Sequence, residues 1–121
     1  MHPLIKKLTN NGPAVTDGSW GTQLQQRGLK RGECPDSWNL SQPDAVEEVA
    51  RQYVEAGSQI ILTNTFGGNR LSLRRFDLGD KAVAINTAGV EISKKILSEP
   101  IPSSIYRSRP NRCAIMKTVL V

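Results

Sequence analysis

The chain has 121 residues, 38% of them hydrophobic, which is enough for one small domain with its own core and too few for two. No apolar run approaches the length of a bilayer span, and the N-terminus lacks the apolar segment of a signal peptide. We therefore expect a cytoplasmic protein with no membrane partner. Two cysteines, Cys34 and Cys113, lie far apart in the sequence and are expected to be free thiols.

The formal charge of +5 raises nucleic acid as a possible partner. Residues 1–97 hold twelve Lys or Arg and ten Asp or Glu, whereas residues 98–121 hold four and one, so the basic excess is concentrated in the tail. A solvated tail and a nucleic-acid-binding arm both explain this pattern. Only one aromatic residue, Tyr106, lies near the tail arginines, so base stacking has little support and nucleic acid is the less favoured interpretation.

Strands and helices are predicted to alternate along most of the chain, which is typical of an α/β fold. Turn residues such as Asn11-Gly12, Gly28 and Gly57 separate the predicted elements. In chain order, we predict a helix over 3–10, a strand over 14–16, a helix over 20–26, a loop over 30–39, a helix over 42–56, a strand over 59–63, and helices over 69–76 and 80–97.

The helix over 42–56 has the clearest pattern. Its apolar residues fall on one face: Val46, Val49, Ala50, Tyr53 and Val54. Ser41 is expected to cap it, with Asp44 at the acidic position of a capping box, and Gly57 is expected to end it. The strand over 59–63 follows almost at once, so this is half of a βαβ unit with a right-handed crossover.

The last helix, over 80–97, is expected to begin at a capping Asp80. Its apolar stripe includes Gly89, which would allow close packing against a sheet. Beyond it the pattern changes, since residues 98–111 contain three prolines and four serines with no periodicity, so we expect them to be irregular. Residues 113–121 form an apolar run that can be a strand.

Two predicted strands end in clusters of small polar residues, where parallel strands commonly present ligand sites. Asp17 and Gly18 follow the first strand, and the Asp17 carboxylate can either bind a ligand ammonium or form an Asx-turn or helix cap. Thr63, Asn64 and Thr65 follow the second strand, and they can either orient a small polar ligand or cap the next helix.

Other catalytic chemistry has little support in the sequence. Trp38 lies in a polar loop, where it can either line a pocket or cover the end of the core. The soft metal ligands Cys34, Cys113 and His2 include no close pair, so no metal site is expected. There is no phosphate-binding glycine loop, and the single histidine near the N-terminus makes a Ser-His-acid arrangement implausible.

Four motifs together resemble the homocysteine S-methyltransferase (homocysteine-binding) domain family. They occur in the family's order, and the resemblance covers roughly residues 13–97. The motifs are Asp17-Gly18-Ser19-Trp20-Gly21-Thr22-Gln23-Leu24, Cys34-Pro35-Asp36-Ser37-Trp38-Asn39, the segment 55–67 that contains Thr63-Asn64-Thr65-Phe66-Gly67, and Asn86-Thr87-Ala88-Gly89-Val90-Glu91.

The resemblance implies a (β/α)8 TIM barrel, a fold that needs about 250 residues. The chain is then the N-terminal portion of such a barrel, truncated after about two to three βα units. Residues 1–97 would form a partial homocysteine-binding domain, and residues 98–121 a divergent basic tail. The family transfers a methyl group to the thiol of homocysteine, with zinc held by three cysteines of later strands. Neither Cys34 nor Cys113 sits in a motif that matches those zinc-binding cysteines, so no cofactor is expected for this chain.

The resemblance also implies roles for the candidate residues. Asp17 and Gly18 would hold the amino-acid end of homocysteine, with the Asp17 carboxylate directed to the open mouth. The other lining residues would be Trp38, Thr63, Asn64, Thr65 and Phe66. We expect the chain alone to be inactive, because the zinc thiolates are missing. Alternatively, it is a non-catalytic fragment that pairs with another polypeptide or self-associates through an open sheet edge. A small basic protein that contacts nucleic acid is the weaker alternative.

Overall fold

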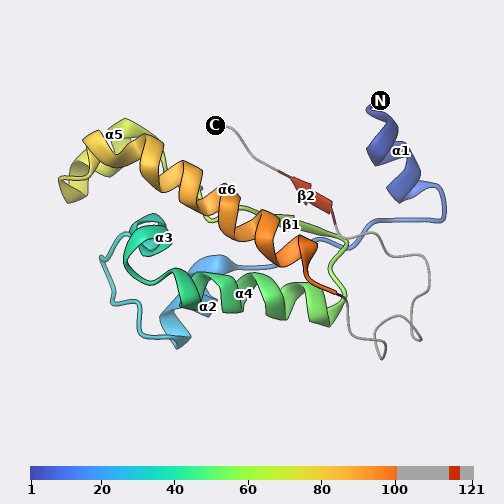
Figure 1. Ribbon diagram of the computed structural model, residues 1–121, viewed down its shortest axis with the longest axis horizontal. Coiled ribbons are helices and arrows are strands. Elements are labelled where there is room, and N and C mark those ends of the chain that lie inside the picture. The colour runs from blue at the N-terminus through green and yellow to red at the C-terminus, as the bar shows by residue number, and fades with distance from the viewer. Residues whose placement is uncertain (101–114, 118–121) are drawn as a thin grey trace.

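The computed structural model describes residues 1–100 together with the backbone of residues 115–117 (Figure 1). Helices dominate, and two short strands lie among them. The elements are α1 (Pro3–Thr9), α2 (Trp20–Gln26), the 3-10 turn η1 (Pro35–Ser37), α3 (Trp38–Ser41), α4 (Pro43–Ala56), β1 (Ile60–Leu62), α5 (Arg70–Leu73), the 3-10 turns η2 (Arg74–Phe76) and η3 (Gly79–Lys81), α6 (Ala82–Ser98) and β2 (Ile115–Lys117).

Strand β1 is the centre of a small parallel arrangement. It pairs with β2 in parallel, with Ile60 opposite Ile115, and Ile60 also forms a parallel bridge with Thr16. The predicted strand over 14–16 is therefore present only as a single bridge, which the backbone hydrogen bond from Asp17 N to Ile60 O extends (3.0 Å). Strand β2 falls within the predicted strand over 113–121, whose other residues lie outside the described part of the chain.

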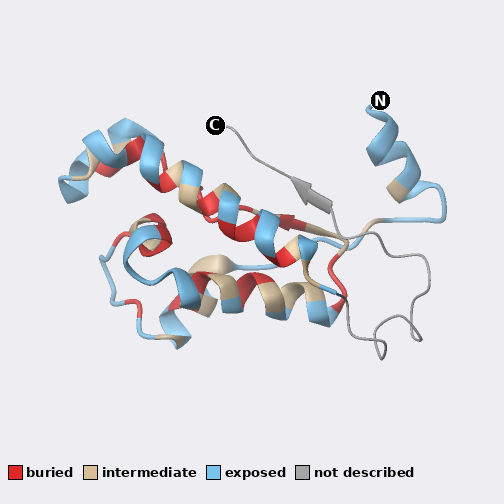
Figure 2. Ribbon diagram, in the orientation of Figure 1, coloured by how far each residue is buried: buried red, intermediate tan, exposed pale blue. Residues whose placement is uncertain are grey.

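Helices α4 and α6 run side by side along the sheet (Figure 1). Their mutually facing sides are buried, as the red segments in Figure 2 show. Ile61 of β1 is 1% exposed and packs in one cluster with Ala50 of α4 and Ile96 of α6. A second cluster joins α2, α3, α4 and α6 around Leu24 and Trp38. Helix α1 has no buried residue and stands apart from these layers (Figure 1).

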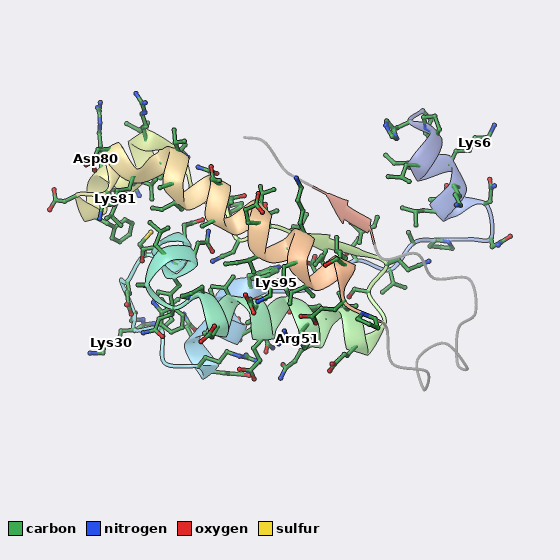
Figure 3. All side chains as sticks on the ribbon, in the orientation of Figure 1. Lys6, Lys30, Arg51, Asp80, Lys81 and Lys95 are labelled. Atoms are coloured by element: carbon green, nitrogen blue, oxygen red, sulfur yellow. The ribbon has the colours of Figure 1, made fainter. Side chains whose placement is uncertain are left out.

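Ion pairs connect the solvent-facing sides of α4 and α6. Lys95 Nζ lies 2.8 Å from Glu47 Oε1, and Arg51 Nη2 lies 3.0 Å from Glu99 Oε1. Figure 3 shows Lys95 and Arg51 along this helix pair. Arg51 Nε also donates to Glu99 Oε2 (3.0 Å), and Glu47 lies between Lys95 and Arg51, so the four charges form one partly exposed network. This network adds to the apolar clusters in holding the two helices together.

The predicted apolar face of α4 and the ending of that helix at Gly57 (φ 103°) are confirmed, but its predicted cap is wrong. Ser41 belongs to α3, where its hydroxyl donates to Ser37 O (3.2 Å), and α4 begins at Pro43 without a side-chain cap. Proline suits this position because the first helical residue needs no N–H partner.

The predicted cap of α6 is also wrong, since Asp80 lies in η3 and α6 begins at Ala82 with no side-chain cap. The predicted helix over 69–76 is present but changes to 3-10 geometry at Arg74. The predicted loop over 30–39 contains η1 and the start of α3. Helix α6 ends at Ser98, and most of the predicted irregular segment 98–111 lies outside the described residues.

Within residues 1–100 and 115–117, no helix has both the length and the apolar character that crossing a membrane requires.

Candidate functional site

The Asp17 carboxylate ties the two polar strand ends together. Its Oδ2 accepts hydrogen bonds from Leu62 N at the end of β1 (2.7 Å) and from the Trp20 indole nitrogen (2.8 Å). Ser19, and not Asp17, caps α2, because Ser19 Oγ accepts from Thr22 N. The sequence left open a ligand contact, an Asx-turn and a cap. The structure shows a fourth role, which is to join the first strand end to β1.

Gly18 lies beside Asp17 and closely approaches the Tyr53 side chain of α4. A Cβ atom there would come within 3.1 Å of the Tyr53 hydroxyl. That hydroxyl donates to Ser19 O (2.6 Å), so it cannot easily move away. The close backbone approach expected of this glycine is thus made to helix α4.

A buried amide pair connects α3 to the end of β1. Asn39 Nδ2 donates to Asn64 O (2.8 Å) and to Ile85 O (3.1 Å). Asn64 Nδ2 donates in return to Asn39 Oδ1 (2.9 Å) and to Pro35 O (3.0 Å). Both side chains are at most 5% exposed, so each needs these partners to avoid a large desolvation cost.

Asp36 makes the next connection between the same two segments. It is 4% exposed, and its Oδ1 accepts from Gly67 N (3.2 Å). Burial raises the pKa of this carboxyl above its ordinary range, partly offset by the bond from Gly67. A Cβ at Gly67 would lie 2.9 Å from Asp36 Oδ2, so only glycine lets the backbone and the carboxylate approach so closely.

Thr63 and Thr65 complete this set of buried polar groups. Their hydroxyls lie 2.7 Å apart and hydrogen-bond to each other. They do not cap the following helix, because Asn69 Oδ1 does so by accepting from Ser72 N (2.9 Å). We call the buried polar side chains at this end, together with the backbone N–H of Gly67, the strand-end network: Asp36, Asn39, Thr63, Asn64, Thr65 and Gly67.

A pocket of about 410 Å³ opens beside the strand-end network. Four of the residues expected from sequence line it, namely Gly18, Thr63, Asn64 and Phe66, the last being 94% exposed. The remaining lining residues were not predicted as site residues, although several lie within the family-like motifs: Trp20, Gly21, Cys34, Pro35, Asp36, Leu62, Gly67, Ser72 and Phe76.

Three residues expected at the site do not line this pocket. Trp38 is 6% exposed in the core, where its indole nitrogen donates to Glu33 Oε1 (3.1 Å). The alternative that Trp38 covers the core therefore describes its position. Asp17 and Thr65 lie just behind the lining, where they hold Leu62 and Thr63 in place.

The pocket combines apolar walls with few polar groups. Trp20, Leu62, Phe66 and Phe76 supply apolar surface, whereas Asp36 supplies a carboxylate. This combination suits a small ligand with an apolar chain and a charged or polar end. Asp36 belongs to the motif 34–39, but nothing in the sequence indicated that its carboxylate reaches Gly67, 31 residues away.

Metal-binding chemistry does not fit the described residues. No group of three His, Cys, Asp or Glu side chains within residues 1–100 is placed to hold a metal ion. Cys34 is a free thiol that lines the pocket, and burial raises its pKa, which disfavours the thiolate that zinc needs. The three-cysteine set implied by the resemblance is not available from the two cysteines of the sequence.

Comparisons with known proteins agree with the resemblance read from the motifs. A family model described as "Homocysteine S-methyltransferase" matches residues 14–108. Methionine synthase from Mycobacterium leprae is 37% identical over 93 residues, and methionine synthase from Mycobacterium tuberculosis is 36% identical over 93 residues. Each match covers 70% of this chain, which spans about 8% of the length of these relatives.

Solved structures show a similar fold. The oxidized form of the homocysteine methyltransferase MmuM from Escherichia coli superposes with a TM-score of 0.70 at 17% identity, over 92% of this chain and 38% of that one. The metallated form gives 0.68 at 18% identity, over 90% of this chain and 38% of that one. At such identities the likeness concerns the fold alone.

Proposed function

The chain belongs to the homocysteine S-methyltransferase family, and on that premise we propose that its pocket forms part of the homocysteine site of a methyltransferase barrel. One observation carries the proposal. Residues from two separate family-like motifs, Gly18 from one and Thr63, Asn64 and Phe66 from the other, line a single pocket where parallel strands end. Active sites of TIM barrels lie at this end of the strands.

The chain would supply the N-terminal portion of a (β/α)8 barrel. Its parallel segments at Thr16, β1 and β2 would be neighbouring barrel strands, and α4 and α6 would belong to the outer helical layer. The small parallel sheet and the superposition on 38% of a solved homocysteine methyltransferase support this assignment. The remaining strands would close the pocket from the opposite side.

Within the pocket, the strand ends would hold homocysteine by its amino-acid end. We assign this contact to Gly18 and to Asp17, which lies just behind the lining, with Thr63, Asn64 and Phe66 lining the chain of the ligand. Trp38 and Thr65 would act from behind the lining, through the core and through Thr63. The open oxygen of Asp17 supports a role for it, because Oδ1 accepts no hydrogen bond within residues 1–100.

Methyl transfer itself would need groups beyond the described residues. The family resemblance implies zinc held by three thiolates, and the sequence contains two cysteines. We therefore expect these 121 residues, assayed alone, to bind homocysteine without turning it over. The alternative is that a second polypeptide supplies the remaining strands and thiolates, in which case activity would appear only in the complex.

Calorimetric titration of the chain with homocysteine tests the proposal. We expect saturable binding that weakens in Thr63→Val, which removes a pocket hydroxyl and keeps the shape of the side chain. The matched control is Thr22→Val, since Thr22 is not among the residues that line the pocket. Equal affinity in wild type and both variants, or no binding by the wild type, would contradict the proposal. Turnover by the purified chain with zinc would contradict its second part.

A further inference from the structure

Asp36 is a buried carboxylate that accepts a hydrogen bond from another residue at only one of its two oxygens. Its residue exposure is 4%, and it lines the pocket. Oδ1 accepts from Gly67 N, whereas Oδ2 accepts no hydrogen bond from any other residue of the described part of the chain. A carboxylate accepts from several donors when it can, so the second oxygen of this pocket-lining residue has unused capacity.

No cation of the described chain neutralises this carboxylate. The ion pairs within residues 1–100 involve Glu47, Glu48 and Glu99, and none involves Asp36. Burial raises the pKa of Asp36, and no basic side chain acts against that effect. Burying an unpaired charge is costly, and a ligand cation would relieve the cost.

Asp17, the other acid near the pocket, has more hydrogen-bond partners than Asp36. Its Oδ2 already accepts two hydrogen bonds, from Leu62 N and from the Trp20 indole nitrogen. Its backbone neighbour Gly18 lines the pocket, but Asp17 does not. Of the two carboxylates, Asp36 is the one that both borders the pocket and has the less satisfied charge.

We propose that Asp36 binds the ammonium group of the pocket's ligand through Oδ2. The pocket then selects a small molecule with a primary ammonium at one end and an apolar chain that lies against Trp20, Leu62 and Phe66. The inference rests on the proposed function, where the ligand is homocysteine, and it names Asp36 as a charge partner for the ammonium in addition to Asp17.

Gly67 is part of this arrangement. A Cβ at this position would lie 2.9 Å from Oδ2 and would displace the carboxylate oxygen that faces the ligand. Gly67 has no positive φ, so alanine meets no backbone strain there. Gly67→Ala therefore moves the carboxylate without removing its charge.

The test compares two ligands that differ only in the ammonium group. Homocysteine and its desamino analogue, in which hydrogen replaces the ammonium, are titrated into the wild-type chain, Asp36→Asn, Gly67→Ala and Asp17→Asn. Asp44→Asn is the matched control, because Asp44 is an exposed acid in the first turn of α4. The asparagine in Asp36→Asn keeps an oxygen that can accept from Gly67 N, so the loop retains that bond.

We expect the wild type to bind homocysteine about tenfold or more tightly than the desamino analogue, the size of one charge-assisted hydrogen bond. Asp36→Asn loses this preference, Gly67→Ala reduces it, and Asp44→Asn keeps it. A preference that survives in Asp36→Asn overturns the inference. A preference lost in Asp17→Asn alone also overturns it, and assigns the ammonium to Asp17.

A second measurement on the wild type needs no variant. Carbon NMR follows the titration of the Asp36 carboxyl with each ligand present. Homocysteine is expected to lower the pKa of Asp36, and the desamino analogue is expected to leave it unchanged. An unchanged pKa with bound homocysteine overturns the inference even if Asp36→Asn fails to fold.

A second pair of ligands separates this inference from the proposed function. 2-Aminobutyrate and butyrate correspond to homocysteine and its desamino analogue without the thiol. If aminobutyrate binds as tightly as homocysteine with the same dependence on Asp36, the ammonium contact stands and the homocysteine assignment fails. If homocysteine binds and Asp36→Asn keeps the full preference, the assignment stands and the ammonium contact fails. If no ligand binds, both are overturned.

Discussion

The helix-covered side of the sheet and the strand-end network are buried to a similar degree but by opposite means. The first, centred on Ala50, Ile61 and Ile96, is apolar and needs no specific partner for any atom. The second buries a carboxylate, two amides and two hydroxyls that are nearly all paired with one another or with backbone. A core tolerates changes of shape better than a polar network tolerates a missing partner, so the second region is where position matters most.

Of the variants proposed here, truncation of Ile61 should lower the stability of the folded chain most, because Ile61 lies in the apolar cluster between the sheet and its helices. Ile61 is 1% exposed, so Ile61→Ala is expected to lower the free energy of unfolding by about 2–5 kcal/mol. Urea denaturation measures the loss. Leu71→Ala is the control, because Leu71 is 75% exposed and should change stability by less than about 0.5 kcal/mol. Similar losses in the two variants would contradict the assigned core.

Removal of the Asn39 amide should affect both stability and ligand binding, unlike a change in the apolar cluster. Asn39→Ala leaves Asn64 O without its side-chain donor and removes one acceptor of Asn64 Nδ2, at an expected cost of about 1–3 kcal/mol. The same variant should weaken homocysteine binding, because Asn64 lines the pocket. Ile61→Ala, measured at a temperature where it remains folded, should keep its affinity. Equal effects of both variants on affinity would remove the distinction between the two regions.

Two glycines offer a matched test of packing against the network. A Cβ at Gly89 of α6 would lie 2.8 Å from both Asn39 Nδ2 and Thr65 Cγ2, so Gly89→Ala should cost about 1–3 kcal/mol. A Cβ at Gly21 of α2 would meet nothing within 4 Å, so Gly21→Ala should stabilise the helix by about 0.5–1 kcal/mol. Thermal unfolding of both variants checks the difference, and effects of the same sign would contradict it.

The titration of Asp36 should change the stability of the chain with pH, by less than the substitutions above. Burial raises the pKa of Asp36 in the folded chain, so the folded state holds a proton that the unfolded state has already released. Its contribution is therefore present at low pH and is lost as the pH rises from the unfolded pKa through the raised folded one. Relative to wild type, Asp36→Asn should gain stability across that window and then level off. Denaturation series from acid to neutral pH measure the stability of Asp36→Asn minus that of wild type. If this difference is constant or falls with pH, the raised pKa of Asp36 is contradicted.

Patterns that depend on neighbours in sequence predicted several helices and one strand well. The apolar stripe and the glycine ending of α4, the bounds of α2 and the parallel strand β1 all follow from residues within one turn or one strand. The predicted caps Ser41 and Asp80 failed because prolines and 3-10 turns set those helix starts. Gly89 was expected to allow packing on a sheet, but it faces Asn39 and Thr65, whose positions only the tertiary structure fixes.

Pocket-lining residues that follow the strands could be predicted from the sequence, whereas those in the connecting segments could not. Gly18, Thr63, Asn64 and Phe66 follow directly from strands, so their place beside the pocket could be inferred from the parallel topology. Asp36 and Cys34 come from a connecting segment that spacing alone could not place. Trp38 lies next to them in sequence but points into the core, because the helical turns η1 and α3 direct neighbouring side chains to opposite sides.

The central claim, that the pocket at the strand ends binds homocysteine, is tested most directly by nuclear Overhauser effects between the ligand and the chain. With homocysteine bound, its methylene protons should show cross-peaks to the rings of Trp20 and Phe66 and to the methyl groups of Leu62, all of which line the pocket. Cross-peaks to residues of α1 or of the outer face of α6 instead, or none at saturating ligand, would contradict the account.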